Sequence, residues 1–180
     1  MKLISILTSI ILFSSLMLPI YAQENSFIKE YLERLENSKK YLILVAETMP
    51  EDKYNFKATT ESMSFAENLM HIGWAMDWHS QSLMGEREAR DWNIDEELKV
   101  ANKSKKEMID KISETFDKTI TFITNFDPNR LKVRLDYFGA DRTKRQILLL
   151  LADHITHHRG QMLVYLRLNG LKPPRYVLYQ

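Results

Sequence analysis

Two histidines near the carboxyl-terminal end of the chain, His154 and His158, have the type and spacing of a metal-binding pair. At about 100° per residue, both share one helical face with Ile147, Leu151 and Tyr165, in an apolar stripe that should face the core. The i, i+4 spacing brings their Cβ atoms within ~6 Å, so both rings can reach one ion. A buried imidazole without a partner costs ~1–3 kcal/mol, and a divalent metal ion would satisfy both rings at once. The alternative is a pair of hydrogen-bonded packing residues, and spacing alone leaves both interpretations open.

The remaining three histidines are less clearly placed. His157 projects toward the edge of the face that carries His154 and His158. His71 and His79 belong to an earlier apolar segment, in which His79 lies nearer the centre of the apolar stripe and His71 on its shoulder. They are ~12 Å apart along a helix axis, so one ion cannot easily use both. Periodicity favours His79 as the inward residue, but spacing does not separate the two.

The elements that must position these histidines are predicted to be helices. Ser64 with Glu67, and Ser104 with Glu107, form capping boxes that open two of them, and Pro50 ends the first. Thr143 with Gln146 caps the last. The apolar periodicity predicts four amphipathic helices, over residues 26–49, 64–84, 104–126 and 143–168.

These four helices predict an all-α protein with a four-helix bundle. The connector between helices 2 and 3, over residues 86–103, is longer than the ~2–8 residues that usually join antiparallel neighbours. It is long enough to recross the bundle, so helices 2 and 3 are expected to run parallel. Trp92 and Ile94 are expected to dock this connector on the bundle. Residues 129–142 are expected to be irregular or briefly extended, with a turn at Gly139.

The chain of 180 residues has a leader-like beginning. An apolar run from Leu3 to Leu18 follows Lys2, and Ala22 precedes a plausible cleavage point at Gln23, which is typical of a secretory signal peptide. The run is short for a membrane span, which needs ~20 residues. We therefore expect residues 1–22 to be removed and residues 23–180 to form one exported domain, periplasmic or secreted, that is not membrane-bound after cleavage.

Composition narrows the functional classes. Without Lys2, basic and acidic residues balance, so nothing favours nucleic acid or an anionic membrane as a partner. The chain has no cysteine, which excludes a disulfide, a covalently attached c-type haem and a thiol nucleophile of its own. The sequence leaves open whether the protein forms a homodimer.

Three segments resemble a known family. The segment His154-Ile-Thr-His-His-Arg-Gly-Gln161 resembles the His-x-x-His-His-Arg-Gly-Gln signature of the DinB/YfiT-like superfamily. Residues 49–57 and 64–72 resemble its first two helices, and residues 165–174 its closing segment. The resemblance implies a four-helix bundle that holds a divalent metal ion, commonly zinc or nickel, on one histidine of the second helix and two of the fourth. Carried over, these ligands are His71, His154 and His158, so the resemblance selects His71 over His79.

Three histidine ligands leave a fourth coordination position open, as in catalytic zinc sites. The resemblance then implies a metal-dependent transferase or hydrolase acting on a small-molecule substrate, with a thiol co-substrate as one option because relatives use small thiols. The alternative is a non-catalytic metal- or ligand-binding bundle, including one that binds haem noncovalently. No general acid or base can be assigned, since the capping role of Glu67 already explains that residue.

Polar neighbours of the predicted ligands have expected roles as well. Asn68 and Gln161 are expected to orient ligand histidines through hydrogen bonds to their free ring nitrogens. Arg159 is expected either to neutralise a carboxylate or to bind an anionic substrate. Trp74 and Trp78 are expected in the core or in a pocket wall.

Overall fold

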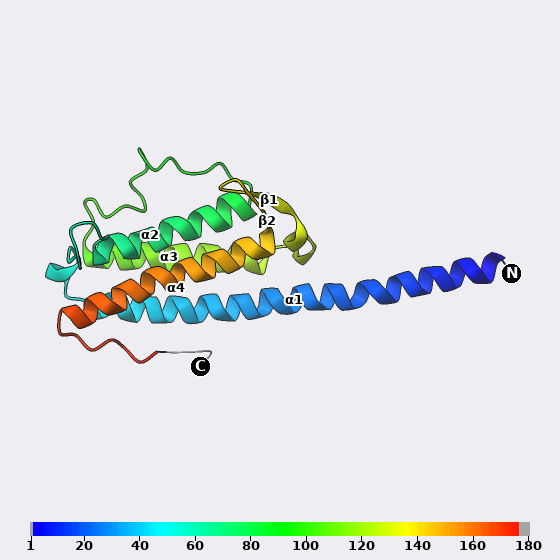
Figure 1. The fold of residues 1–180 in the computed structure, drawn as a ribbon, viewed down its shortest axis with the longest axis horizontal. Coiled ribbons are helices and arrows are strands. Elements are labelled where there is room, and N and C mark those ends of the chain that lie inside the picture. Colours follow the sequence, from blue (N-terminus) through cyan, green and yellow to red (C-terminus); the bar gives the residue numbers. More distant parts are fainter. Residues whose placement is uncertain (1, 177–180) are drawn as a thin grey trace.

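The computed structural model describes the backbone over residues 2–176 and the side chains over residues 24–176. Four long helices lie side by side (Figure 1), and this confirms the predicted all-α four-helix fold: α1 (Lys2–Thr48), α2 (Phe65–Asp77), α3 (Lys105–Thr124) and α4 (Lys144–Leu168). The predicted signal peptide over residues 1–22 lies outside the part whose side chains are described. Among the described residues, no helix combines the length and the apolar character needed to cross a membrane.

Helices α2, α3 and α4 begin where the sequence predicts because their caps form, whereas α1 begins at Lys2 and not at residue 26 as predicted. Ser64 Oγ accepts a hydrogen bond from the Glu67 backbone amide at 3.1 Å, and the Glu67 carboxylate accepts one from the Ser64 amide at 2.6 Å. The same reciprocal pair opens α3 at Ser104 and α4 at Thr143. Each cap satisfies two amide groups that a helix start would otherwise leave without partners.

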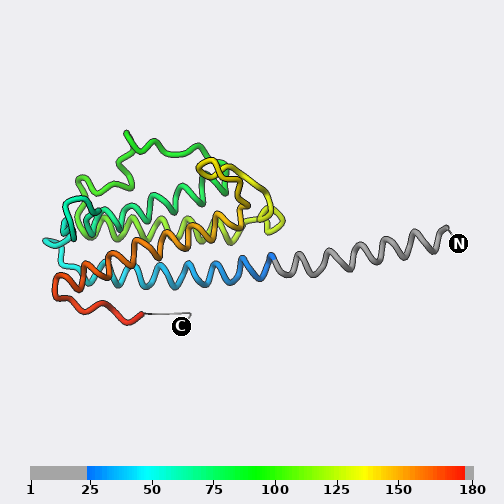
Figure 2. The backbone as a smooth tube through the Cα atoms, viewed as in Figure 1, coloured from blue at the N-terminus to red at the C-terminus, as the bar shows by residue number. Residues whose placement is uncertain are grey.

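The helix directions follow from contacts at the two ends of the bundle. Lys105, at the start of α3, donates to the carbonyl of Glu47 at 2.7 Å, near the end of α1. Tyr165, near the end of α4, donates to the carbonyl of Met63 at 2.9 Å, just before α2. Helices α2 and α3 therefore run parallel to each other and antiparallel to α1 and α4, as the chain trace in Figure 2 shows. This confirms the predicted long crossover between α2 and α3.

The crossover is held to the bundle by ion pairs and one tryptophan. Arg90 contacts the buried carboxylate of Asp77, at the end of α2, at 3.1 Å. The Trp92 ring packs edge-on against Trp74, with ring centroids 4.5 Å apart, so this residue docks as predicted. The same prediction was wrong for Ile94, which is 78% exposed.

Two further elements close the end of the bundle where α4 begins. A π-helix (Trp78–Met84) continues α2, where a regular α-helix was predicted. Strands β1 (Arg134–Tyr137) and β2 (Ala140–Thr143) pair antiparallel within the segment predicted to be briefly extended. Phe138 and Gly139 form the two-residue turn with φ values of 53° and 78°, which is the type I′ geometry that tight hairpins favour.

Candidate metal centre

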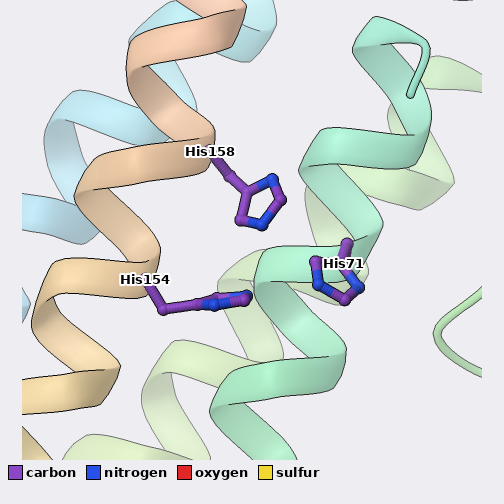
Figure 3. Close-up of side chains that lie close together, drawn as sticks. All are labelled: His71, His154 and His158. Carbon is purple, nitrogen blue, oxygen red and sulfur yellow. The ribbon is translucent and has the colours of Figure 1, made fainter. Parts of the chain in front are cut away.

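Three histidines meet between α2 and α4. His154 and His158 extend from successive turns of α4 toward His71 on α2 (Figure 3). The ring centroids of His154 and His158 are 4.5 Å apart. The ring centroid of His71 is 5.0 Å from that of His154 and 4.7 Å from that of His158. One ring nitrogen from each residue lies within 4.8 Å of the other two. The structure thus brings together the three histidines that the family resemblance selected.

Hydrogen bonding leaves the cluster with unused nitrogens. His71 Nδ1 and His154 Nε2 are buried side-chain atoms without a hydrogen-bond partner in the described structure. Buried polar atoms are nearly always paired in folded proteins, because an unpaired one costs ~1–3 kcal/mol. Two such atoms in one cluster of histidines point to a partner that the described protein groups do not supply.

Asn68 fixes the third ring. The Asn68 side-chain amide is fully buried and donates to the carbonyls of Met63 at 3.2 Å and Ser64 at 2.9 Å. Its oxygen must therefore face His158, whose Nδ1 lies 2.8 Å away and has to carry the proton. The lone pair of His158 is then on Nε2, the nitrogen that remains available as a metal ligand. The predicted orienting role of Asn68 is confirmed.

Burial also keeps the cluster uncharged. Burial, followed by the neighbouring histidines, lowers the pKa of His154 to about 3. Burial, together with His71 and His157, lowers the pKa of His158 to about 4. The pKa of His71 is lowered by burial as well. All three imidazoles are neutral at pH 7, which is the form that binds a metal ion.

His79 is the more deeply buried alternative, as periodicity predicted, but both of its nitrogens have protein partners. Only 2% of its surface is exposed. Its Nδ1 lies 2.6 Å from the carbonyl of Ala75 and must donate there, so Nε2 accepts from the Tyr137 hydroxyl at 3.1 Å. This tautomer leaves no lone pair for an ion. His79 instead ties the hairpin residue Tyr137 to the π-helix that continues α2, a contact for which the sequence carried no periodic signal.

Four other polar residues of α4 lie in surroundings that differ from those of the histidine cluster. His157 is exposed, and its Nε2 pairs with Gln161 at 2.9 Å, so the expectation that Gln161 orients a ligand histidine was wrong. Arg159 is buried with its guanidinium over the Tyr41 ring of α1, at 5.2 Å from the ring centre. Asp153 is largely exposed and faces Arg34.

The cluster fits a divalent metal ion. Two nitrogens on one tetrahedral zinc ion lie ~3.4 Å apart, so small rotations of the three rings would bring their lone pairs to one point. Neutral imidazoles suit zinc and nickel, and three of them leave a coordination position for another ligand. The residues that would hold the ion are His71, His154 and His158.

Comparison with known proteins agrees with this architecture. The sequence matches the DinB family over residues 22–179. The chain belongs to the DinB family. The uncharacterized protein YjoA of Bacillus subtilis strain 168 is 24% identical to this DinB protein over 152 residues, which are 82% of this chain and 92% of YjoA.

Solved structures show the same fold. The crystal structure of YjoA, a DinB-like protein, superposes with a TM-score of 0.64 at 20% identity and covers 84% of this chain and 97% of its own. A DinB-like protein from Bacillus cereus ATCC 10987 gives a TM-score of 0.65 at 20% identity, covering 85% and 97%. These similarities establish the DinB fold of the bundle.

Proposed function

We propose that this DinB protein binds one divalent metal ion, zinc or nickel, on His71, His154 and His158. The observation that carries the proposal is the pair of buried nitrogens without partners, His71 Nδ1 and His154 Nε2, beside a His158 ring whose tautomer Asn68 fixes. Membership of a family that binds metals in general supports it.

We further propose that the site serves a metal-dependent transferase or hydrolase acting on a small molecule. A bound divalent ion would supply Lewis acidity at its open coordination position. The neutral histidines keep the ion's charge uncompensated, while Asn68 holds His158 in its binding tautomer. Because the chain has no cysteine, a thiol reaction would require a thiol co-substrate.

The non-catalytic alternative is a bundle that only binds the ion. A haem version of that alternative fits less well, because axial haem ligands lie on opposite sides of a wide porphyrin plane. Here three ring nitrogens lie within 4.8 Å of one another, so no two of these histidines can ligate one haem from opposite faces, and a haem would need one histidine together with a methionine.

Metal content of protein purified without a polyhistidine tag tests the proposal. We expect one zinc or nickel ion per chain, lost in each of the variants His71→Ala, His154→Ala and His158→Ala. His157→Ala and His79→Ala are the matched controls and should retain the ion, because His157 lies at the edge and both nitrogens of His79 are engaged. Loss of metal in His79→Ala with retention in His71→Ala would overturn the ligand assignment.

We also propose that the protein is exported and begins at or near Gln23 in its mature form. The apolar run before Pro19 and the small residue Ala22 support cleavage there. Intact-mass measurement of the exported protein tests it, and a mass that retains residues 1–22 would indicate a membrane anchor instead.

A further inference from the structure

A cavity lies directly beside the histidine cluster. It has a volume of about 410 Å³ and is bounded by the segment before α2, by the first turns of α2 and by the crossover, and His71 is the histidine of the cluster that lies in its wall. At ~30 Å³ per water molecule this is far more than an ion and its water ligands need, and it falls within the ~300–1,000 Å³ range of small-molecule pockets. His71 therefore lines both the cluster and the cavity.

The walls of the cavity are mainly apolar. Met63 and Met70 come from the α2 side, and Trp92, Leu98 and Val100 from the crossover. Met70 and Leu98 are almost fully buried, so they form a fixed floor, whereas Met63 and Trp92 are partly exposed. Methionine and tryptophan side chains adapt well to flat or branched apolar groups. The surface that a ligand would meet here is apolar and aromatic.

The charges around this space favour an anionic group at the cluster end. Three neutral imidazoles leave the positive charge of a divalent ion uncompensated. Among the acidic residues of the cavity wall, Glu67 is already engaged, since its carboxylate accepts from the Ser64 amide at 2.6 Å and pairs with Lys57 at 3.2 Å. The rim residues Lys57 and Lys99 pair with Glu67 and Glu96, and Glu61 is a further acidic residue of the wall, so the ion itself would be the charge that attracts an anion.

We propose that the cavity binds the apolar body of a small carboxylic acid whose carboxylate reaches the histidine cluster. The substrate class is thus an aromatic or branched aliphatic acid of the size that small-molecule pockets of this volume hold. Trp92 and Met70 contact the body, and the ion held by His71, His154 and His158 meets the carboxylate. Binding of the ligand's carboxylate rests on the proposed metal site. Binding of its apolar body rests on the cavity alone.

Binding of two matched probes separates these parts. The probes are 4-phenylbutyrate and its neutral counterpart 4-phenylbutanol, titrated calorimetrically into the full-length protein with and without zinc. We expect 4-phenylbutanol to bind both forms with similar affinity, because only the cavity holds it. We expect 4-phenylbutyrate to bind the zinc-loaded form at least tenfold more tightly than the zinc-free form.

The variant Val100→Trp fills the cavity from the crossover, where Val100 is only half-buried. It should weaken both probes at least tenfold and leave the zinc stoichiometry unchanged. Val133→Trp is the matched control, because Val133 is 42% exposed and is not among the residues that line the cavity.

The outcomes distinguish the two proposals. No binding of either probe, or unchanged binding in Val100→Trp, would overturn the cavity assignment even if zinc binds stoichiometrically. A protein that fails to bind zinc but binds 4-phenylbutanol in a Val100-dependent manner would support the cavity and refute the metal site. Equal affinity of zinc-loaded protein for both probes would overturn the carboxylate assignment.

Discussion

The substitution Asn68→Leu tests whether one buried amide prepares the cluster for metal. Leucine has a similar volume, so the change removes hydrogen bonds without opening a large cavity. The two carbonyls that Asn68 contacts keep other partners, since Met63 still accepts from the Tyr165 hydroxyl and Ser64 from the residue 68 amide. The group left without a partner is His158 Nδ1–H, which then has no side-chain acceptor to donate to.

The expected losses of stability and of zinc affinity both follow from the lost hydrogen bond between Asn68 and His158. An unpaired buried donor costs ~1–3 kcal/mol, so urea denaturation of the metal-free protein should show a loss of stability of this size. Without the acceptor, His158 can move its proton to Nε2 and withdraw the lone pair from the cluster. Loss of such an orienting partner typically weakens a metal site by ~10–100-fold, and we expect a zinc affinity lower by this factor in a chelator competition at pH 7.

Ser80→Ala provides the matched control. Ser80 is fully buried and donates to the Met76 carbonyl at 2.8 Å, away from the cluster. The control should lose stability and keep its zinc affinity, which separates general destabilisation from a direct effect on the site. If Asn68→Leu bound zinc within about threefold of the parent protein, the argument from the His158 tautomer would be refuted.

Two more outcomes are expected. In metal-free protein, His154 and His158 stay neutral well below the pH of ~6.5 at which they take up protons in the unfolded chain, because burial lowers the pKa of each. Stability should therefore be full above pH ~6.5 and fall by ~1.4 kcal/mol per pH unit for each histidine as the pH is lowered toward 4; equal urea midpoints at pH 7 and pH 5 would contradict this. Phe138→Asn should stabilise the protein by ~1 kcal/mol and so raise its melting temperature. Phe138 is 81% exposed and occupies a left-handed turn position, and Asn-Gly is the preferred residue pair of a type I′ turn. A calorimetric melting temperature below that of the parent would show that the ring contacts of Phe138 with Trp78 outweigh the backbone strain.

The bundle was largely predictable from local signals. A capping box or a proline such as Pro50 ends or starts a helix through residues that are close together in the sequence, so these helix ends can be read from the sequence directly. The length of the crossover implied that α2 and α3 run parallel. The π-helix from Trp78 was not predictable, because widening of a helix depends on what packs around it. The wrong prediction that Ile94 docks on the bundle has the same origin, because a single apolar residue in a loop has no periodic pattern that shows which way it faces.

The site was predictable only in part. The inward i, i+4 pair followed from the pattern, but the third ligand did not, since burial and ligation are different properties. His79 is the deeper residue, and its nitrogens are occupied by Ala75 and by a hairpin tyrosine distant in sequence. His71 is less buried and keeps an unpaired nitrogen. The apolar stripe of a helix predicts how deeply a residue is buried. Whether a histidine has a free lone pair depends on hydrogen-bond partners that other elements supply.

The division of the cluster between α2 and α4 has a consequence for the folding of the chain. Helix α4 is the last long helix in the chain and therefore the last to be synthesised. Until α4 docks on α2, the ligands are divided between one imidazole on α2 and a pair on α4, and neither part has all three ligands of the site. Ion capture and final docking are therefore one thermodynamic event, and saturating ion at ~1,000 times its dissociation constant would add ~4 kcal/mol to the assembled state only. The ion would thus act as a reversible crosslink between α2 and α4. It would stabilise chains in which both helices have docked and not chains that lack this contact.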